Sequence, residues 1–148
     1  MELATVGYEG ATVDSFLKAL QDAGVDLVVD VRAVANSRKP GFAKTRLSSN
    51  LRKAGIGYVH LRGLGTPAEG RAAARAGRHA DMFAIYREHL VTAVAQTDLV
   101  RLTELVRSEQ TVCLLCLESD PAHCHRSLVA DAVASELPVQ LTHLNAVG

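Results

Sequence analysis

The chain has 148 residues, of which 48% are hydrophobic and 22% charged, and these values are typical of one globular domain. A chain of this length buries enough apolar surface to fold without disulfides or a structural metal. Its longest apolar run, Val112–Leu117, is far shorter than the roughly 20 residues of a membrane helix. We therefore expect a single domain over residues 1–148 and no interaction with a membrane.

The cysteines and the first residues favour a reducing compartment. Three cysteines are an odd number, and two of them lie in one apolar run, unlike the cysteines of a secreted disulfide framework. The segment Met1-Glu2-Leu3 lacks a basic stretch that leads into a long apolar segment. We expect a cytoplasmic protein.

The N-terminal half predicts strands that alternate with helices. Leu3–Val6 is a short apolar strand, and Thr12 can cap a helix that ends at Gly24. Leu27–Val31 is nearly all apolar and β-branched, as in a strand covered on both faces. A loop over 37–41, a helix over 45–53 and a strand over 56–61 follow. The Gly-containing segment 62–79 is predicted to be a long, mobile connection.

The C-terminal half continues the alternation. Helices are predicted over 80–95, 98–107 and 127–136, and strands over 111–117 and 139–144. This order predicts an α/β fold, a three-layer open sheet of about five mostly parallel strands with helices on both faces. Ligands of such sheets bind beyond the carboxyl ends of the strands.

The neutral net charge hides a strongly basic segment, 32–78. It holds eleven of the sixteen Lys and Arg residues but only one acid, Glu69. Such asymmetry predicts an electropositive surface for phosphate-bearing ligands or nucleic acid, although a solvated surface paired with acids elsewhere has the same composition. Its connection carries arginines that could close over a bound anion or follow a nucleic-acid backbone, namely Arg62, Arg71, Arg75 and Arg78.

Polar residues gather at the predicted ends of the first two strands. Asp30 and Arg32 lie on one side of their strand, where Asp30 is either catalytic or an orienting partner for the arginine. The Gly-Tyr-Glu-Gly turn allows close backbone approach to a ligand, and its glutamate supplies a carboxylate. From these segments we predict as ligand-binding residues Gly7, Tyr8, Glu9, Arg32, Arg38 and Lys39.

The segment 116–126 concentrates the reactive groups. Cys116 and Glu118 share one face of a strand, whereas Cys113 points the other way and is predicted to be core. Cys124, if it lies in the first turn of the next helix, is either a thiolate nucleophile or redox thiol, or a structural cysteine that packs inward. A Cys116–Cys124 dithiol is conceivable if their Cα atoms approach closely.

We predict Asp30, Glu118 and Cys124 as catalytic candidates, and in segment 116–126 we add as ligand-binding residues Cys116, His125 and Arg126. A metal site is not predicted, because adjacent residues rarely chelate one ion together and no second ligand pair has the usual spacing. The cofactor is left open.

Together these motifs resemble the domain of unknown function 488 family over nearly the whole chain. The resemblance is carried by Thr5-Val6-Gly7-Tyr8-Glu9-Gly10, Asp30-Val31-Arg32, Ser37-Arg38-Lys39-Pro40-Gly41-Phe42, Tyr58, Leu64-Gly65, Leu114-Leu115-Cys116-Leu117-Glu118 and Cys124-His125-Arg126. Ala35 and Thr66 depart from the family pattern, which usually has proline and often has glycine there. The resemblance implies an α/β fold with a polar site and supplies no reaction.

The sequence thus favours a protein that binds a phosphate-bearing, anionic ligand in an Arg/Asp/Glu/Cys cleft, with enzymatic activity left open. The alternative is a nucleic-acid-binding module that uses the basic segment 32–78, and a third hypothesis is a structural or partner-binding protein. The expected partner is a small anionic ligand or nucleic acid. The oligomeric state is left open.

Overall fold

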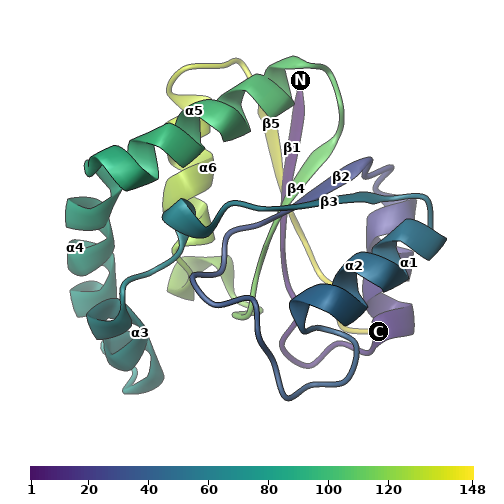
Figure 1. The fold of residues 1–148 in the computed structure, drawn as a ribbon, viewed down its shortest axis with the longest axis horizontal. Helices are drawn as coiled ribbons and strands as arrows, with labels where there is room; N and C mark the ends of the chain where they lie inside the picture. The colour runs from purple at the N-terminus through teal and green to yellow at the C-terminus, as the bar shows by residue number, and fades with distance from the viewer.

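A computed structural model describes residues 1–148, and it contains one five-stranded sheet in the order β3-β2-β4-β1-β5. The strands are β1 (Glu2–Gly7), β2 (Leu27–Asp30), β3 (Gly57–His60), β4 (Val112–Cys116) and β5 (Gln140–Leu144). All neighbouring pairs are parallel. Helices cover both faces (Figure 1), so the predicted three-layer α/β fold is confirmed.

Two hydrophobic cores lie on opposite faces of the sheet, because successive strand residues point to opposite sides. One core joins Cys113 and Leu115 to α1 (Val13–Asp22) and α2 (Lys44–Lys53). The other joins Leu114 and Cys116 to α4 (His79–Leu90), α5 (Ala93–Arg107) and α6 (Arg126–Ala134), with Ala73 of α3 (Ala68–Arg75). The prediction that Cys113 is a core residue is confirmed.

This division of the helices explains where a cleft opens. The chain leaves β1 and β2 toward the α1 and α2 face, whereas it leaves β4, which lies between them, toward the α6 face. Connections that diverge from adjacent strands leave a crevice at the carboxyl ends. Gly7, Asp30 and Cys116, the last residues of these three strands, therefore border one edge of the sheet.

The prediction of a long, mobile connection over 62–79 is wrong. The structure has a 3-10 helix, η1 (Arg62–Leu64), and then α3 in this segment. Residues 71–75, Arg-Ala-Ala-Ala-Arg, favour a helix, and glycines here serve close packing. A Cβ on Gly65 would lie 2.2 Å from the Ala33 Cα atom, so η1 packs directly against the backbone after β2.

Two helix boundaries also differ from the prediction. The first of the two adjacent helices ends at Leu90, and Thr92 caps α5 by accepting a hydrogen bond from the Ala95 N–H. After β4, Pro121–His123 form a separate 3-10 helix, η2, which Asp120 caps, and α6 begins at Arg126. Cys124 therefore precedes α6 and does not lie in the first turn of that helix. No helix of the protein has the length and apolarity that spanning a membrane requires.

Candidate functional site

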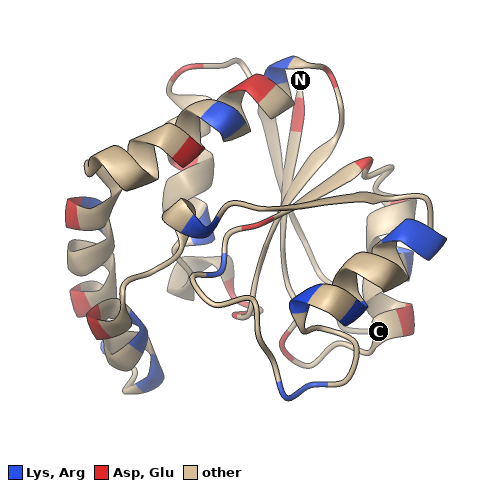
Figure 2. Cartoon of the chain, viewed as in Figure 1, with Lys and Arg blue, Asp and Glu red and all other residues tan.

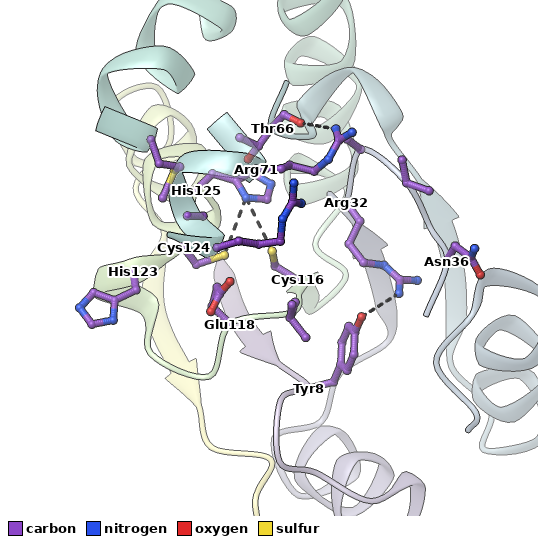
Figure 3. Close-up of a pocket in the computed structure, with 16 residues that line it drawn as sticks. Tyr8, Arg32, Asn36, Thr66, Arg71, Cys116, Glu118, His123, Cys124 and His125 are labelled. Atoms are coloured by element: carbon purple, nitrogen blue, oxygen red, sulfur yellow. Dashed lines mark hydrogen bonds between the residues drawn. The ribbon is translucent and has the colours of Figure 1, made fainter. Parts of the chain in front are cut away.

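A cavity of about 200 Å³ opens at the carboxyl end of the sheet, between the residues after β4 and helices α3 and α4 (Figure 3). Three of its lining residues are arginines and one is an acid. The lining residues are Tyr8, Arg32, Ala33, Val34, Asn36, Thr66, Arg71, Ala74, Arg75, Met82, Cys116, Leu117, Glu118, His123, Cys124 and His125.

The Arg32 guanidinium is held in a bidentate ion pair with Asp30. Nε donates to one carboxylate oxygen of Asp30 at 2.9 Å and Nη2 donates to the other at 2.7 Å. The Arg32 N–H and the Tyr58 hydroxyl also donate to Asp30, and Arg32 Nη1 donates to the Phe42 carbonyl. Burial alone would lower the pKa of Arg32, but Asp30 outweighs burial and raises it. Asp30 is wholly buried, so this geometry is that of an orienting partner.

Arg71 and Arg75 bring positive charge to the cavity without a carboxylate partner. They lie four residues apart on α3, which places both side chains on one helix face. Arg71 donates to the Thr66 carbonyl at 2.9 Å, and Arg75 makes no side-chain hydrogen bond. Neither belongs to an ion pair of the protein. These two guanidiniums are free to bind an anion.

Cys116, Cys124 and His125 meet at the inner end of the cavity (Figure 3). The His125 Nδ1 atom lies 3.6 Å from the Cys116 sulfur and 3.8 Å from the Cys124 sulfur, and both thiols are free. They are the one group of three His, Cys, Asp or Glu side chains in the protein that is close enough to hold a metal ion.

The two thiols have opposite protonation tendencies. The hydrogen bond to Cys124, followed by burial, raises the pKa of Cys116 well above its ordinary value. Burial would also raise the pKa of Cys124, but the hydrogen bond from Cys116 and the charges of His125 and Arg126 outweigh it and lower the pKa well below its ordinary value. Deprotonation is therefore favoured at Cys124 over Cys116.

Arg126 is wholly buried behind this group and does not line the cavity. Its Nε donates to the Thr5 hydroxyl at 3.1 Å, and its Nη atoms donate to the carbonyls of Glu118 and Ser119. Arg126 therefore holds the loop between the two cysteines in place. These bonds direct its guanidinium to the loop backbone, so Arg126 does not join Arg32 in the lining of the cavity.

Glu118 lines the cavity, whereas Glu9 lies outside it. Burial, followed by the charge of Glu9, raises the pKa of Glu118. Glu9 is exposed and accepts weak hydrogen bonds from the Ser119 N–H and hydroxyl at 3.5 and 3.4 Å. Glu118 therefore keeps its proton to a higher pH than an exposed carboxyl group does.

The cavity gathers six of the twelve predicted site residues, which are Tyr8, Arg32, Cys116, Glu118, Cys124 and His125. Gly7 lies outside it and packs on the loop, where an added Cβ would overlap the Glu118 carbonyl. Arg38 is exposed, and the Lys39 ammonium lies 6.0 Å from the centre of the Phe42 ring. Neither of these two predicted ligand-binding residues lines the cavity.

The Lys and Arg residues of the basic segment 32–78 are distributed over separate elements. Figure 2 shows its Lys and Arg residues on α2, on the loop before α2 and on α3. The two helices belong to opposite faces of the sheet. The segment therefore places only three of its charged side chains on the cavity.

The sequence prediction of the site omitted Asn36, Thr66 and His123, and it treated Arg71 and Arg75 as part of a loop. The sequence did contain a signal for the two arginines: they are four residues apart with three alanines between them, and this pattern indicates a helix with both arginines on one face. His123 had no such signal; its ring stacks on the His79 ring of α4, with the centroids 4.0 Å apart.

A family model described as Domain of unknown function DUF488 matches residues 12–133. Comparison with curated proteins and with solved structures found no match. The family match covers the cavity residues except Tyr8.

Proposed function

The chain belongs to the DUF488 family, whose description assigns no activity, and from the cavity we propose that it binds a small anionic ligand through a phosphate or carboxylate group. The observation that carries this proposal is the pair of unpaired guanidiniums, Arg71 and Arg75, on one wall. Guanidinium groups bind phosphate and carboxylate oxygens with strong, charge-assisted hydrogen bonds.

Each wall of the cavity has a distinct part in this proposal. Arg71 and Arg75 hold the anion, and Arg32, fixed by Asp30, forms another part of the lining. The ligand's other end then lies against Glu118 and the Cys124 sulfur, which are the groups able to exchange a proton or attack. At about 200 Å³ the cavity accepts a compact ligand, smaller than most drug-sized molecules.

A thermal-shift and calorimetric screen tests this function. Inorganic phosphate, sugar phosphates, nucleoside monophosphates and small dicarboxylates are compared with their uncharged counterparts. A ligand at 100 times its Kd adds about 2.7 kcal/mol to the free energy of unfolding, which raises Tm by several degrees in a domain of this size. We expect such a rise for at least one compact anion and none for its uncharged counterpart.

Two double variants separate the cavity from the general surface charge. Arg71→Gln with Arg75→Gln is expected to abolish the rise in Tm. Arg101→Gln with Arg107→Gln removes the same charge from exposed positions of α5 and is expected to retain it. A screen without any anion-dependent stabilisation, or stabilisation that survives the first double variant, contradicts the proposal.

A further inference from the structure

The three side chains at the inner end of the cavity have the composition of a transition-metal site. Cys116, Cys124 and His125 are buried, and their ligand atoms all lie within 4.8 Å of one another. Two thiolates and an imidazole are the donors that Zn²⁺ prefers. No other group of three such side chains in the protein comes this close.

The distances between the ligand atoms match tetrahedral coordination. With a Zn–S bond of about 2.3 Å and a Zn–N bond of about 2.0 Å, the sulfur and nitrogen atoms of a tetrahedral site lie about 3.5 Å apart. The His125 Nδ1 atom lies 3.6 Å from the Cys116 sulfur and 3.8 Å from the Cys124 sulfur. The side chains therefore need only small movements to surround an ion.

The far side of the imidazole ring is fixed in the way that metal-bound histidines are. His125 Nε2 lies 2.7 Å from the Val31 carbonyl oxygen, which can only accept a hydrogen bond. Nε2 therefore carries a proton, and Nδ1 is the nitrogen that faces the two sulfurs. A hydrogen bond from the second ring nitrogen to a carbonyl orients metal-bound histidines and fixes their tautomer.

The backbone explains how adjacent residues can point to one place. Cys124 has extended backbone angles, φ −128° and ψ 141°, and His125 is helical, φ −61° and ψ −20°. The change of conformation between them turns both side chains toward Cys116 at the end of β4. Arg126 fixes the intervening loop through the Glu118 and Ser119 carbonyls.

We propose that Cys116, Cys124 and His125 bind a Zn²⁺ ion with three protein ligands and a fourth position that opens into the cavity. Structural zinc sites are closed by four protein ligands, whereas catalytic sites keep one position for water or substrate. All three ligands line the cavity, so a fourth ligand can reach the ion from it. This proposal does not rest on anion binding by Arg71 and Arg75.

Cobalt spectroscopy on the reduced, metal-free full chain tests the site. Co²⁺ is titrated as a coloured probe, and Zn²⁺ affinity is then measured by competition with a chromophoric chelator. We expect one ion per chain, a thiolate-to-cobalt charge-transfer band and the intense visible bands of tetrahedral cobalt. Cys116→Ser and Cys124→Ser are each expected to weaken Zn²⁺ binding at least about 100-fold, since they remove a direct ligand.

Cys113→Ala is the matched control, because Cys113 lies on the same strand as Cys116 but faces the opposite core. It is expected to retain the cobalt spectrum and the zinc affinity. Wild-type protein supplies a measurement that does not depend on a folded variant: Zn²⁺ is expected to raise its Tm and to shield two thiols from alkylation. The proposal is overturned if wild-type protein shows no charge-transfer band. It is also overturned if the band survives in both serine variants, or if it disappears in Cys113→Ala.

Discussion

The Asp30 carboxylate forms a bidentate ion pair with the Arg32 guanidinium, whose Nε and Nη2 atoms donate to its two oxygens at 2.9 and 2.7 Å. The Arg32 N–H and the Tyr58 hydroxyl take the remaining acceptor positions. A carboxylate that accepts four hydrogen bonds in a buried site orients its partners. The pair therefore fixes the wall of the cavity after β2.

Asp30→Asn is expected to destabilise the protein by about 3–5 kcal/mol, because it leaves the buried Arg32 charge without a counterion. Urea unfolding monitored by circular dichroism measures the loss. Asp22→Asn is the control: it breaks the exposed Lys18–Asp22 pair and is expected to leave the stability almost unchanged. If Asp30→Asn lowers the free energy of unfolding by less than about 1 kcal/mol, the Asp30–Arg32 pair does not stabilise this wall of the cavity.

Gly7→Ala is expected to cost about 1–3 kcal/mol or more, because its Cβ would overlap the Glu118 carbonyl and push the loop away from β1. A Cβ on Gly57, at the exposed start of β3, would lie 3.0 Å from the flexible end of the Leu27 side chain and 3.6 Å from the Asp26 carbonyl oxygen, so Gly57→Ala is expected to cost less than Gly7→Ala. Chemical denaturation compares the two. Equal effects would refute the close approach of β1 and the loop.

Arg126→Lys keeps the charge but loses the planar fork that reaches the Thr5 hydroxyl and two loop carbonyls. We expect a destabilisation of about 1–3 kcal/mol from the carbonyls left without donors, together with a 10- to 100-fold weaker zinc affinity. Arg107→Lys, on the exposed side of α5, is the control and should change neither quantity. Urea unfolding measures the stability, and competition with a chelator measures the zinc affinity. An unchanged zinc affinity would show that Arg126 does not position the metal ligands.

Salt dependence discriminates a compact ligand from nucleic acid. Arg71 and Arg75 supply two cations, so binding of a duplex oligonucleotide at the cavity is expected to show a slope of log affinity against log salt no steeper than about −2. Fluorescence anisotropy measures the slope. Replacing three of the basic residues of α2, Arg46, Arg52 and Lys53, by glutamine should leave the small-anion affinity within about twofold, since they do not line the cavity.

A slope of about −4 or steeper that becomes shallower in the α2 variant would instead support nucleic-acid binding by the basic segment. The separation of α2 and α3 onto opposite faces of the sheet is the structural reason for expecting the shallow slope.

Local sequence patterns determined most of the fold. The apolar strands, the Thr12 cap and the alternation of strands with helices all act over a few residues, and the structure confirms each. The one missed helix, α3, was hidden by glycines at 63, 65 and 70. In the sequence alone these glycines indicate a loop. In the structure, Gly65 and Gly70 are glycines because a Cβ there would contact Ala33, Thr66 or Ile85.

For the site, the sequence alone determined that reactive groups follow the strands, because the carboxyl ends of parallel strands meet at one edge. Only the tertiary structure decided which of them face the cavity. Arg32 lines it while Arg126 turns to the loop carbonyls, and Cys116 and Cys124 share one imidazole nitrogen. Side-chain direction at a loop depends on backbone angles and on packing between segments distant in the chain, and neither is encoded in residue spacing.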